Sequence, residues 1–199
     1  MFEFMTVREL YEMVMSGAEF ETESLEYVEL DGWVRTNRDN GKVGFLALND
    51  GTYFRNCQIV YLKETLEDYD TIKHISTGSA IRVLGKFKLT PESKQPFEIE
   101  ATQIVVEGAC DDDFPLQKKR HSFEYMREIP HLRPRANTFY AIFRLRSVLS
   151  MAIHEFFQSQ GFVYVHTPLI TGNDGEGAGE MFRATTIDGT NFEDDFFEK

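Results

Sequence analysis

A cluster of cations near the middle of this chain has the residue types that bind a polyanion. Residues 115–155 contain eight lysines and arginines against three glutamates, a local net charge of +5. The whole chain carries −12, so all other residues together carry −17. A basic segment in an acidic protein is typical of a surface that holds phosphate groups. A solvated hinge between two domains accounts for the same charge, so both interpretations stay open.

A second candidate for close ligand contact is the glycine-rich segment 172–180, G-N-D-G-E-G-A-G-E, with four glycines in nine residues. Such a segment is typical of a loop that is mobile or that approaches a ligand closely. Its spacing does not match the glycine motifs of dinucleotide-binding or P-loop proteins, which excludes those two classes.

Metal and disulfide chemistry find no support in the sequence. Cys57 and Cys110 are far apart and belong to no metal-binding motif, and the histidines are scattered. We therefore assign no metal ligand and no catalytic residue. Two cysteines without a partner motif are typical of a reducing compartment. Because the N-terminus has no signal-peptide character and no apolar run is long enough to span a bilayer, we expect a cytoplasmic protein. The charge of −12 disfavours DNA and anionic membranes as partners, but not one folded RNA.

The elements that must position these groups begin with a β domain. Apolar and polar residues alternate in five expected strands, at 25–34, 43–48, 56–62, 79–89 and 97–106, with a helix expected at 64–75. Three strands, a helix and two strands is the order of an OB-fold, a five-stranded Greek-key barrel that binds single-stranded nucleic acid. Other small β barrels share this order.

Helices flank the β domain in the sequence. Thr6-Val7-Arg8-Glu9 has the form of a capping box, and Gly17 is suited to end that helix. A long amphipathic helix is expected from Thr138 to Gln160, followed by a strand at 162–166. Prolines in the basic segment indicate a joint between compact units. We therefore divide the chain into a β domain (1–110), a hinge (111–135) and the start of a second domain (136–199).

G-W-V-R at 32–35, Phe45 and Gln58 resemble the anticodon-binding domain of the class IIb aminoacyl-tRNA synthetases. Further segments resemble the asparaginyl-tRNA synthetases in particular. The segments that resemble later parts are P-L-Q-K-K-R-H-S-F-E-Y-M-R (115–127) and H-L-R-P-R-A-N-T-F (131–139) for the hinge, G-F-V-Y-V-H-T-P-L-I (161–170) for motif 1, and G-E-G-A-G-E-M-F (175–182) for the asparagine-side loop. The resemblance implies an α+β fold, in which an N-terminal OB-fold barrel is followed by the beginning of an antiparallel-sheet catalytic domain.

The resemblance also implies an anticodon site. Phe45 would stack on an anticodon base, and Arg38 and Gln58 would recognise the middle uridine. A flat aromatic ring offers a stacking platform, and glutamine offers both a donor and an acceptor to a base edge. Without the resemblance, periodicity favours Phe45 as a core residue, Gln58 as a solvated one and Arg38 as a turn residue.

Two further positions match the family by resemblance. Glu180 matches the loop glutamate that meets the α-amino group of the amino-acid substrate, as a carboxylate meets an ammonium. Pro168 matches the motif 1 proline at the homodimer interface. Without the resemblance, Glu180 is an exposed acid in a glycine-rich loop and Pro168 merely ends a strand.

The implied activity is that of an asparagine–tRNA ligase, which uses ATP and Mg²⁺ to attach asparagine to tRNA(Asn) through an aminoacyl-adenylate. Motifs 2 and 3, which hold ATP in this class, have no counterpart here: Thr185 stands where motif 2 has a glutamate after Phe182-Arg183-Ala184. We therefore expect an N-terminal portion of such an enzyme, which binds neither ATP nor Mg²⁺ and is inactive alone.

Three alternatives remain. An aspartyl-type or non-discriminating synthetase would share the middle uridine and the loop glutamate. A non-catalytic OB-fold module would bind single-stranded nucleic acid without any need for the motif 1 segment. A truncated, inactive chain would expose apolar surface and aggregate or dimerise.

Overall fold

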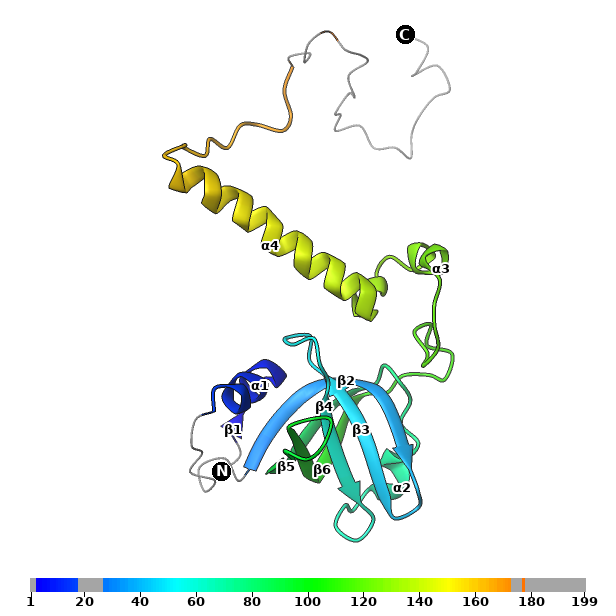
Figure 1. The fold of residues 1–199 in the computed structure, drawn as a ribbon. Coiled ribbons are helices and arrows are strands. Elements are labelled where there is room, and N and C mark those ends of the chain that lie inside the picture. Colours follow the sequence, from blue (N-terminus) through cyan, green and yellow to red (C-terminus); the bar gives the residue numbers. More distant parts are fainter. Residues whose placement is uncertain (1–2, 18–26, 173–176, 178–199) are drawn as a thin grey trace, which may run out of the picture. The chain divides into compact units, whose positions relative to one another are not determined.

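The computed structural model describes residues 3–17, 27–172 and 177. The chain divides into two compact units, Met1–Ala152 and Ile153–Lys199. The first unit is built around a β barrel with short helices beside it (Figure 1). The second unit holds the end of the last helix and the segment that follows it. None of the helices within the described ranges has the length and apolar character needed to cross a membrane.

The strands are β1 (Glu3–Phe4), β2 (Tyr27–Asp39), β3 (Val43–Asn49), β4 (Cys57–Leu62), β5 (Ala80–Leu89) and β6 (Phe97–Gly108). The helices are α1 (Val7–Met15), α2 (Tyr69–Ile72), α3 (Phe123–Glu128), the 3-10 turn η1 (Arg133–Arg135) and α4 (Asn137–Ser159). All five expected strands and the long helix are present. The short elements β1, α3 and η1 were not predicted.

Hydrogen bonding closes the sheet on itself. The strand order is β1-β2-β3-β4-β6-β5, and an additional pairing of β2 with β5 completes the ring. Within the ring only β4 and β6 run parallel, and the other neighbours are antiparallel. Closure removes the unpaired strand edges that make open sheets prone to association. The barrel therefore confirms the OB-fold prediction for this part of the chain.

The core lies inside the barrel because the side chains of each strand alternate between its two faces. The inward residues are at most 1% exposed and include Val28, Leu30, Val34, Leu46, Leu48, Ile59, Tyr61, Ile81, Val83, Phe97 and Ile99. A methyl group added at Gly44 would lie 1.9 Å from Cζ of Tyr61. The glycine therefore gives the Tyr61 ring room to lie across β3.

Helix α1 covers one end of this core. Its capping box is present as predicted: Thr6 Oγ1 accepts from the Glu9 amide at 3.2 Å, and the Thr6 amide donates to Glu9 Oε2 at 2.7 Å. The Thr6 hydroxyl also donates to Glu9 Oε2 at 2.7 Å, and this bond, together with the one from the Thr6 amide, lowers the pKa of the Glu9 carboxyl. Leu10 and Tyr11 are buried in the core cluster, so α1 is part of the barrel's hydrophobic core.

Two predictions of secondary structure were wrong. The helix expected at 64–75 has only four α-helical residues, those of α2, because the chain reaches it through turns in which Thr65 and Leu66 bond back to Leu62. The strand expected at 162–166 is not formed. A strand needs a neighbour for its backbone groups, and residues 3–17, 27–172 and 177 offer this segment none. Val163 is accordingly 84% exposed.

Candidate nucleic-acid interface

The structure brings Arg38, Phe45 and Gln58 together on the outer face of β2, β3 and β4. Arg38 and Phe45 are directly paired across β2 and β3, and the Arg38 guanidinium carbon lies 5.2 Å from the centre of the Phe45 ring. The neighbours of Phe45 along β3, Gly44 and Leu46, are buried, whereas Phe45 is half-buried. Phe45 is therefore an outward residue and not part of the core.

Gln58 lies on the same face, between the buried Cys57 and Ile59. Its Nε2 donates a hydrogen bond to Oε2 of Glu98 on β6 at 3.3 Å. The parallel pairing of Ile59 with Ile99 makes these two side chains neighbours. Sequence reasoning missed Glu98. The alternation of F-E-I-E-A at 97–101 was the available signal, because it turns the two glutamates away from the core.

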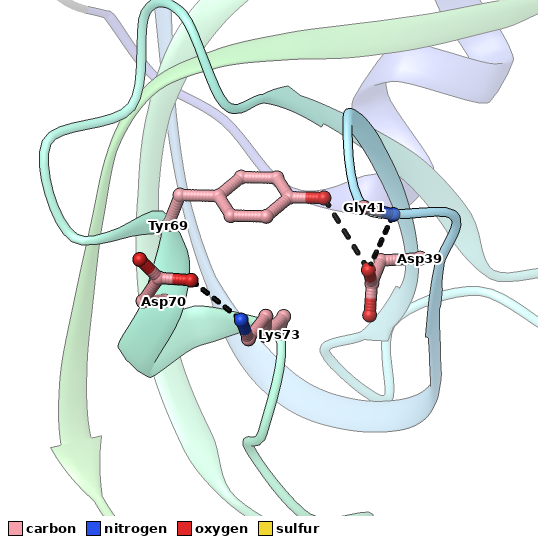
Figure 2. Close-up of polar contacts among 5 residues, drawn as sticks. All are labelled: Asp39, Gly41, Tyr69, Asp70 and Lys73. Carbon is pink, nitrogen blue, oxygen red and sulfur yellow. Dashed lines mark hydrogen bonds and ion pairs between the residues drawn. The ribbon is translucent and has the colours of Figure 1, made fainter.

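The β2–β3 turn, which begins just after Arg38, is bonded to helix α2, and Figure 2 shows this contact. Oδ1 of Asp39 accepts from the Gly41 amide at 2.8 Å and from the Tyr69 hydroxyl at 3.4 Å. Burial raises the pKa of the Tyr69 phenol, and the negative charge of Asp39 raises it further. Asp70 on this helix forms an ion pair at 2.5 Å with Lys73, the residue that follows the helix. Helix α2 thus helps to hold the β2–β3 turn in one conformation.

A polar network inside the barrel reinforces this arrangement. The Tyr61 hydroxyl donates to Oδ1 of Asn37 at 2.8 Å, and Nδ2 of Asn37 donates to the Ile72 carbonyl at 2.8 Å. Burial raises the pKa of Tyr61 to about 12. Because Asn37 precedes Arg38, the network joins the arginine-bearing end of β2 to both β4 and α2.

A cleft of about 1040 Å³ lies within the first unit, between β2, the hinge and the beginning of α4. Its lining includes five cations, Arg35, Lys118, Lys119, Arg120 and Arg135. The single acid in the lining is Glu124. The basic segment found in the sequence therefore faces a concave surface, which supports the interpretation that it binds a polyanion.

Two arginines in this basic cleft stand close together. Arg35 donates to the Arg135 carbonyl at 2.5 Å and to Oδ1 of Asn137 at 3.1 Å. Burial lowers the pKa of Arg35, and the charge of Arg135 lowers it further. The Arg135 guanidinium lies 4.6 Å from the centre of the Trp33 ring. Within the described ranges neither arginine has a carboxylate partner, so their positive charges stay available to an anion.

The loop between β3 and β4 connects the barrel to both flanking helices. The Thr52 carbonyl accepts from Nη2 of Arg8 on α1 and from Nη2 of Arg144 on α4, each at 2.8 Å. The neighbouring Gly51 carbonyl accepts from the Tyr140 hydroxyl and from Arg144, each at 2.9 Å. The first turns of α4 are therefore held against the same loop that follows Phe45 and precedes Gln58.

The two remaining predicted site residues lie elsewhere in the chain. Pro168 is exposed in the extended segment after α4, in the second unit. Glu180 lies outside the described residues. In the described part of the chain, no three His, Cys, Asp or Glu side chains are grouped so as to hold a metal ion. None of the described residues is therefore assigned to Mg²⁺.

Two family models match this chain. The OB-fold nucleic acid binding domain matches residues 28–107, which form the barrel, and the model of tRNA synthetases class II (D, K and N) matches residues 122–197. The first match ends shortly before the hinge, and the second begins within the hinge, at residue 122. Residues 122–197 are therefore similar to the class II tRNA synthetases of this group.

Its relatives narrow the assignment within that class. An asparagine–tRNA ligase of Alkaliphilus oremlandii is 54% identical over 182 residues, which cover 86% of this chain and 39% of that protein. One of Acetivibrio thermocellus is 56% identical over 178 residues, 84% of this chain and 38% of that protein. The crystal structure of asparaginyl-tRNA synthetase from Pyrococcus horikoshii with asparaginyl-adenylate superposes with a TM-score of 0.72 and 27% identity, over 81% of this chain and 38% of that one. This chain is similar to the asparaginyl-tRNA synthetases over more than four fifths of its length, and it spans about two fifths of the length of these curated relatives.

Proposed function

We propose that this chain recognises the anticodon of tRNA(Asn) as part of an asparagine–tRNA ligase. The observation that carries the proposal is the outer face of the barrel. There Phe45 on β3 is paired with Arg38 on β2, and Gln58 on β4 lies two positions from Val60, the residue that pairs with Phe45 on that strand. The family match over residues 122–197 favours a synthetase over a free-standing OB-fold module. The asparaginyl relatives favour asparagine over aspartate as the amino acid.

Each of the three side chains has a distinct task in this proposal. The half-buried ring of Phe45 stacks on a base of the anticodon, a contact worth about 1–3 kcal/mol. Arg38, held beside the ring, places a positive charge near the RNA backbone. Gln58 forms hydrogen bonds with the edge of the middle base, a uridine in the anticodon GUU.

The basic cleft extends this interface. Arg35 and Arg38 are three residues apart on β2, which corresponds to about 10 Å along a strand. An RNA whose anticodon lies on the outer face therefore has backbone phosphates within reach of the cleft. The unpaired charges of Arg35 and Arg135 and the lysines at 118 and 119 bind those phosphates without regard to base sequence.

The proposal is tested by binding of an anticodon stem-loop that carries GUU. We expect Phe45→Ala to lower its affinity about tenfold or more, because the stacking platform is lost. Changing the middle uridine to cytidine should weaken binding by the wild-type chain. A matched control is Phe4→Ala, which removes an exposed phenylalanine on β1 and should leave the affinity unchanged. Equal affinity for both RNAs, unaffected by Phe45→Ala, would refute anticodon recognition.

The remaining partners follow from the family and are proposals of the same kind. The complete activity joins asparagine to ATP and then to tRNA(Asn), and Mg²⁺ supplies charge balance at the phosphates when it is bound. Glu180 is proposed to meet the α-amino group of asparagine. A homodimer is proposed through Pro168 and the apolar face of α4. The thiols of Cys57 and Cys110, both unpaired, support a cytoplasmic location.

A further inference from the structure

The loop between β3 and β4 carries an exposed aromatic ring close to two arginines that come from different helices. We propose that this loop, together with the beginnings of α1 and α4, binds an unpaired nucleotide of the transfer RNA. Phe54 stacks on the base, and Arg8 and Arg144 hold the adjoining phosphate. This loop site is separate from the outer face that carries Phe45. The inference rests on the proposed function, because it takes the RNA of that function as its ligand.

Phe54 belongs to a cluster of three flat groups. Its ring lies 5.6 Å from the ring of Tyr140 on α4, centre to centre, at an interplanar angle of 18°. The guanidinium carbon of Arg144, one turn further along α4, lies 4.9 Å from the centre of the same tyrosine ring. Phe54 is 52% exposed, whereas Tyr140 and Arg144 are half-buried. The tyrosine therefore supports the phenylalanine ring, and the exposed part of that ring is open to a base.

The two arginines converge on one carbonyl oxygen. Nη2 of Arg8 and Nη2 of Arg144 each lie 2.8 Å from the Thr52 oxygen, so two positive charges are held close together. In the described part of the chain neither arginine has a carboxylate within ion-pair distance. Asp50, the acid beside Thr52, accepts instead from the amides of Val7 and Thr52. Because like charges repel each other, an anion bound at both guanidiniums is favoured.

Both guanidiniums keep donors that a phosphate can use. Arg8 donates from Nε and Nη2 to the Thr52 carbonyl. Arg144 donates from Nε to the Tyr140 hydroxyl and from Nη2 to the Gly51 and Thr52 carbonyls. A guanidinium has five N–H donors, and within the described ranges Nη1 of each arginine makes no hydrogen bond. The Nη1 groups therefore remain for phosphate oxygens.

The loop site continues the basic cleft. Asn56, two residues after Phe54, and Phe139, immediately before Tyr140, both line that cleft. An RNA whose phosphates lie in the cleft therefore has the exposed ring of Phe54 at its border. A basic groove with an aromatic platform is the combination that binds single-stranded nucleic acid. The base must be unpaired, so it belongs either to the anticodon loop or to another unpaired part of the transfer RNA.

The experiment measures binding of the GUU stem-loop and of full-length tRNA(Asn) by wild type and Phe54→Leu. Leucine keeps apolar contact with Tyr140 but offers no flat ring, so we expect the affinity to fall about fivefold or more. A loss with both RNAs assigns the nucleotide to the anticodon loop, and a loss with tRNA(Asn) alone assigns it to another part. Phe54→Trp keeps a flat ring and should bind like wild type. Phe4→Leu, on β1, is the matched control and should change neither affinity.

The salt dependence of tRNA(Asn) binding tests the arginines. Arg8→Gln removes one charge from the loop site. We expect the slope of log affinity against log salt concentration to become shallower by about 1, as for the loss of one phosphate contact. Arg146→Gln removes the same charge from α4 two residues beyond Arg144, where the side chain lies on another face of the helix, and should leave the slope unchanged. A change of packing alone would lower the affinity without altering the slope.

The outcomes separate this inference from the function on which it rests. If Phe54→Leu binds both RNAs like wild type, the inference is wrong, whereas a preference of wild type for GUU over GCU leaves anticodon recognition intact. If Phe54→Trp loses as much affinity as Phe54→Leu, the ring acts in packing and the stacking site is refuted. Equal slopes for Arg8→Gln and Arg146→Gln refute the phosphate contact. If wild type shows no preference for GUU, anticodon recognition is wrong, and a loss specific to Phe54→Leu still supports the loop site.

Discussion

The barrel and helix α4 use apolar residues of the same kinds to opposite effect. In the barrel, every strand has a face that meets other strands, and its apolar side chains are almost wholly buried. Helix α4 carries an equally regular apolar stripe, yet none of its described residues is buried. Leu145 is 59% exposed and Phe156 is 60% exposed. The difference lies in the partners that the described residues supply, because a periodic pattern indicates which face can be buried but does not provide the surface that buries it.

The comparison has a consequence for stability. Because hydrophobic stabilisation follows the apolar area removed from water, the barrel should account for nearly all the cooperative unfolding of this chain. Helix α4 should contribute little beyond the hydrogen bonds of Tyr140 and Arg144 to the β3–β4 loop.

A pair of leucine truncations tests the difference between the barrel and α4 most directly. Leu30→Ala empties a site that is fully buried in the barrel, and we expect it to lower the free energy of unfolding by about 2–5 kcal/mol. Leu149→Ala removes the same atoms from a site that is 52% exposed, with an expected change within about 0.5 kcal/mol. Urea unfolding followed by circular dichroism measures both. Similar losses in the two variants would show that the stripe of α4 is covered in solution.

A smaller effect on the free energy of unfolding, confined to the barrel, is expected from Tyr61 at high pH. Its folded pKa of about 12 exceeds the value of about 10 for an exposed phenol. The stabilisation from keeping this phenol neutral is therefore complete below about pH 10 and is lost as the pH rises towards 12, by about 2 kcal/mol. Burial also raises the pKa of the Cys57 thiol. Because an exposed thiol ionises at lower pH than an exposed phenol, wild type should begin to lose stability at a pH below that at which Tyr61 contributes. Tyr61→Phe should lack the part of the loss between pH 10 and 12. Parallel curves for the two proteins from pH 9 to 12 would contradict this account.

The smallest effect on stability is expected from charged substitutions on α4. Their effect is measured on self-association instead. Leu145→Asp places a charge on the apolar stripe and should leave the urea midpoint of the barrel nearly unchanged. If a second copy covers the stripe, this variant should sediment as a monomer under conditions in which wild type does not. Ser147→Asp adds the same charge on the polar side of the helix and serves as the control. A wild-type chain that is a compact monomer at all concentrations would argue against the proposed homodimer.

The sequence predicted those parts of the fold that depend on local pattern. Alternation located all five barrel strands, and the Thr6–Glu9 spacing located the start of α1. Arg38, Phe45 and Gln58 were chosen through the family resemblance and not from the pattern, and their shared face became visible only with the strand register. Features that depend on long-range contact were missed. The hydrogen bond of Glu98 to Gln58 joins residues 40 positions apart, and the strand expected at 162–166 failed because pairing is a property of two segments and not of one.

The hydrogen bonds to the Gly51 and Thr52 carbonyls limit where this protein can accept inserted residues. Surface loops usually accept added residues, because their backbone has few fixed partners. Here the partners are fixed on both sides, since Arg8 approaches from one helix and Arg144 from another. One residue inserted between positions 50 and 53 would move the acceptors away from at least one of these arginines. The hairpin between β3 and β4 therefore has a defined length, and tolerated insertions should fall in other loops, such as the one at residues 91–96.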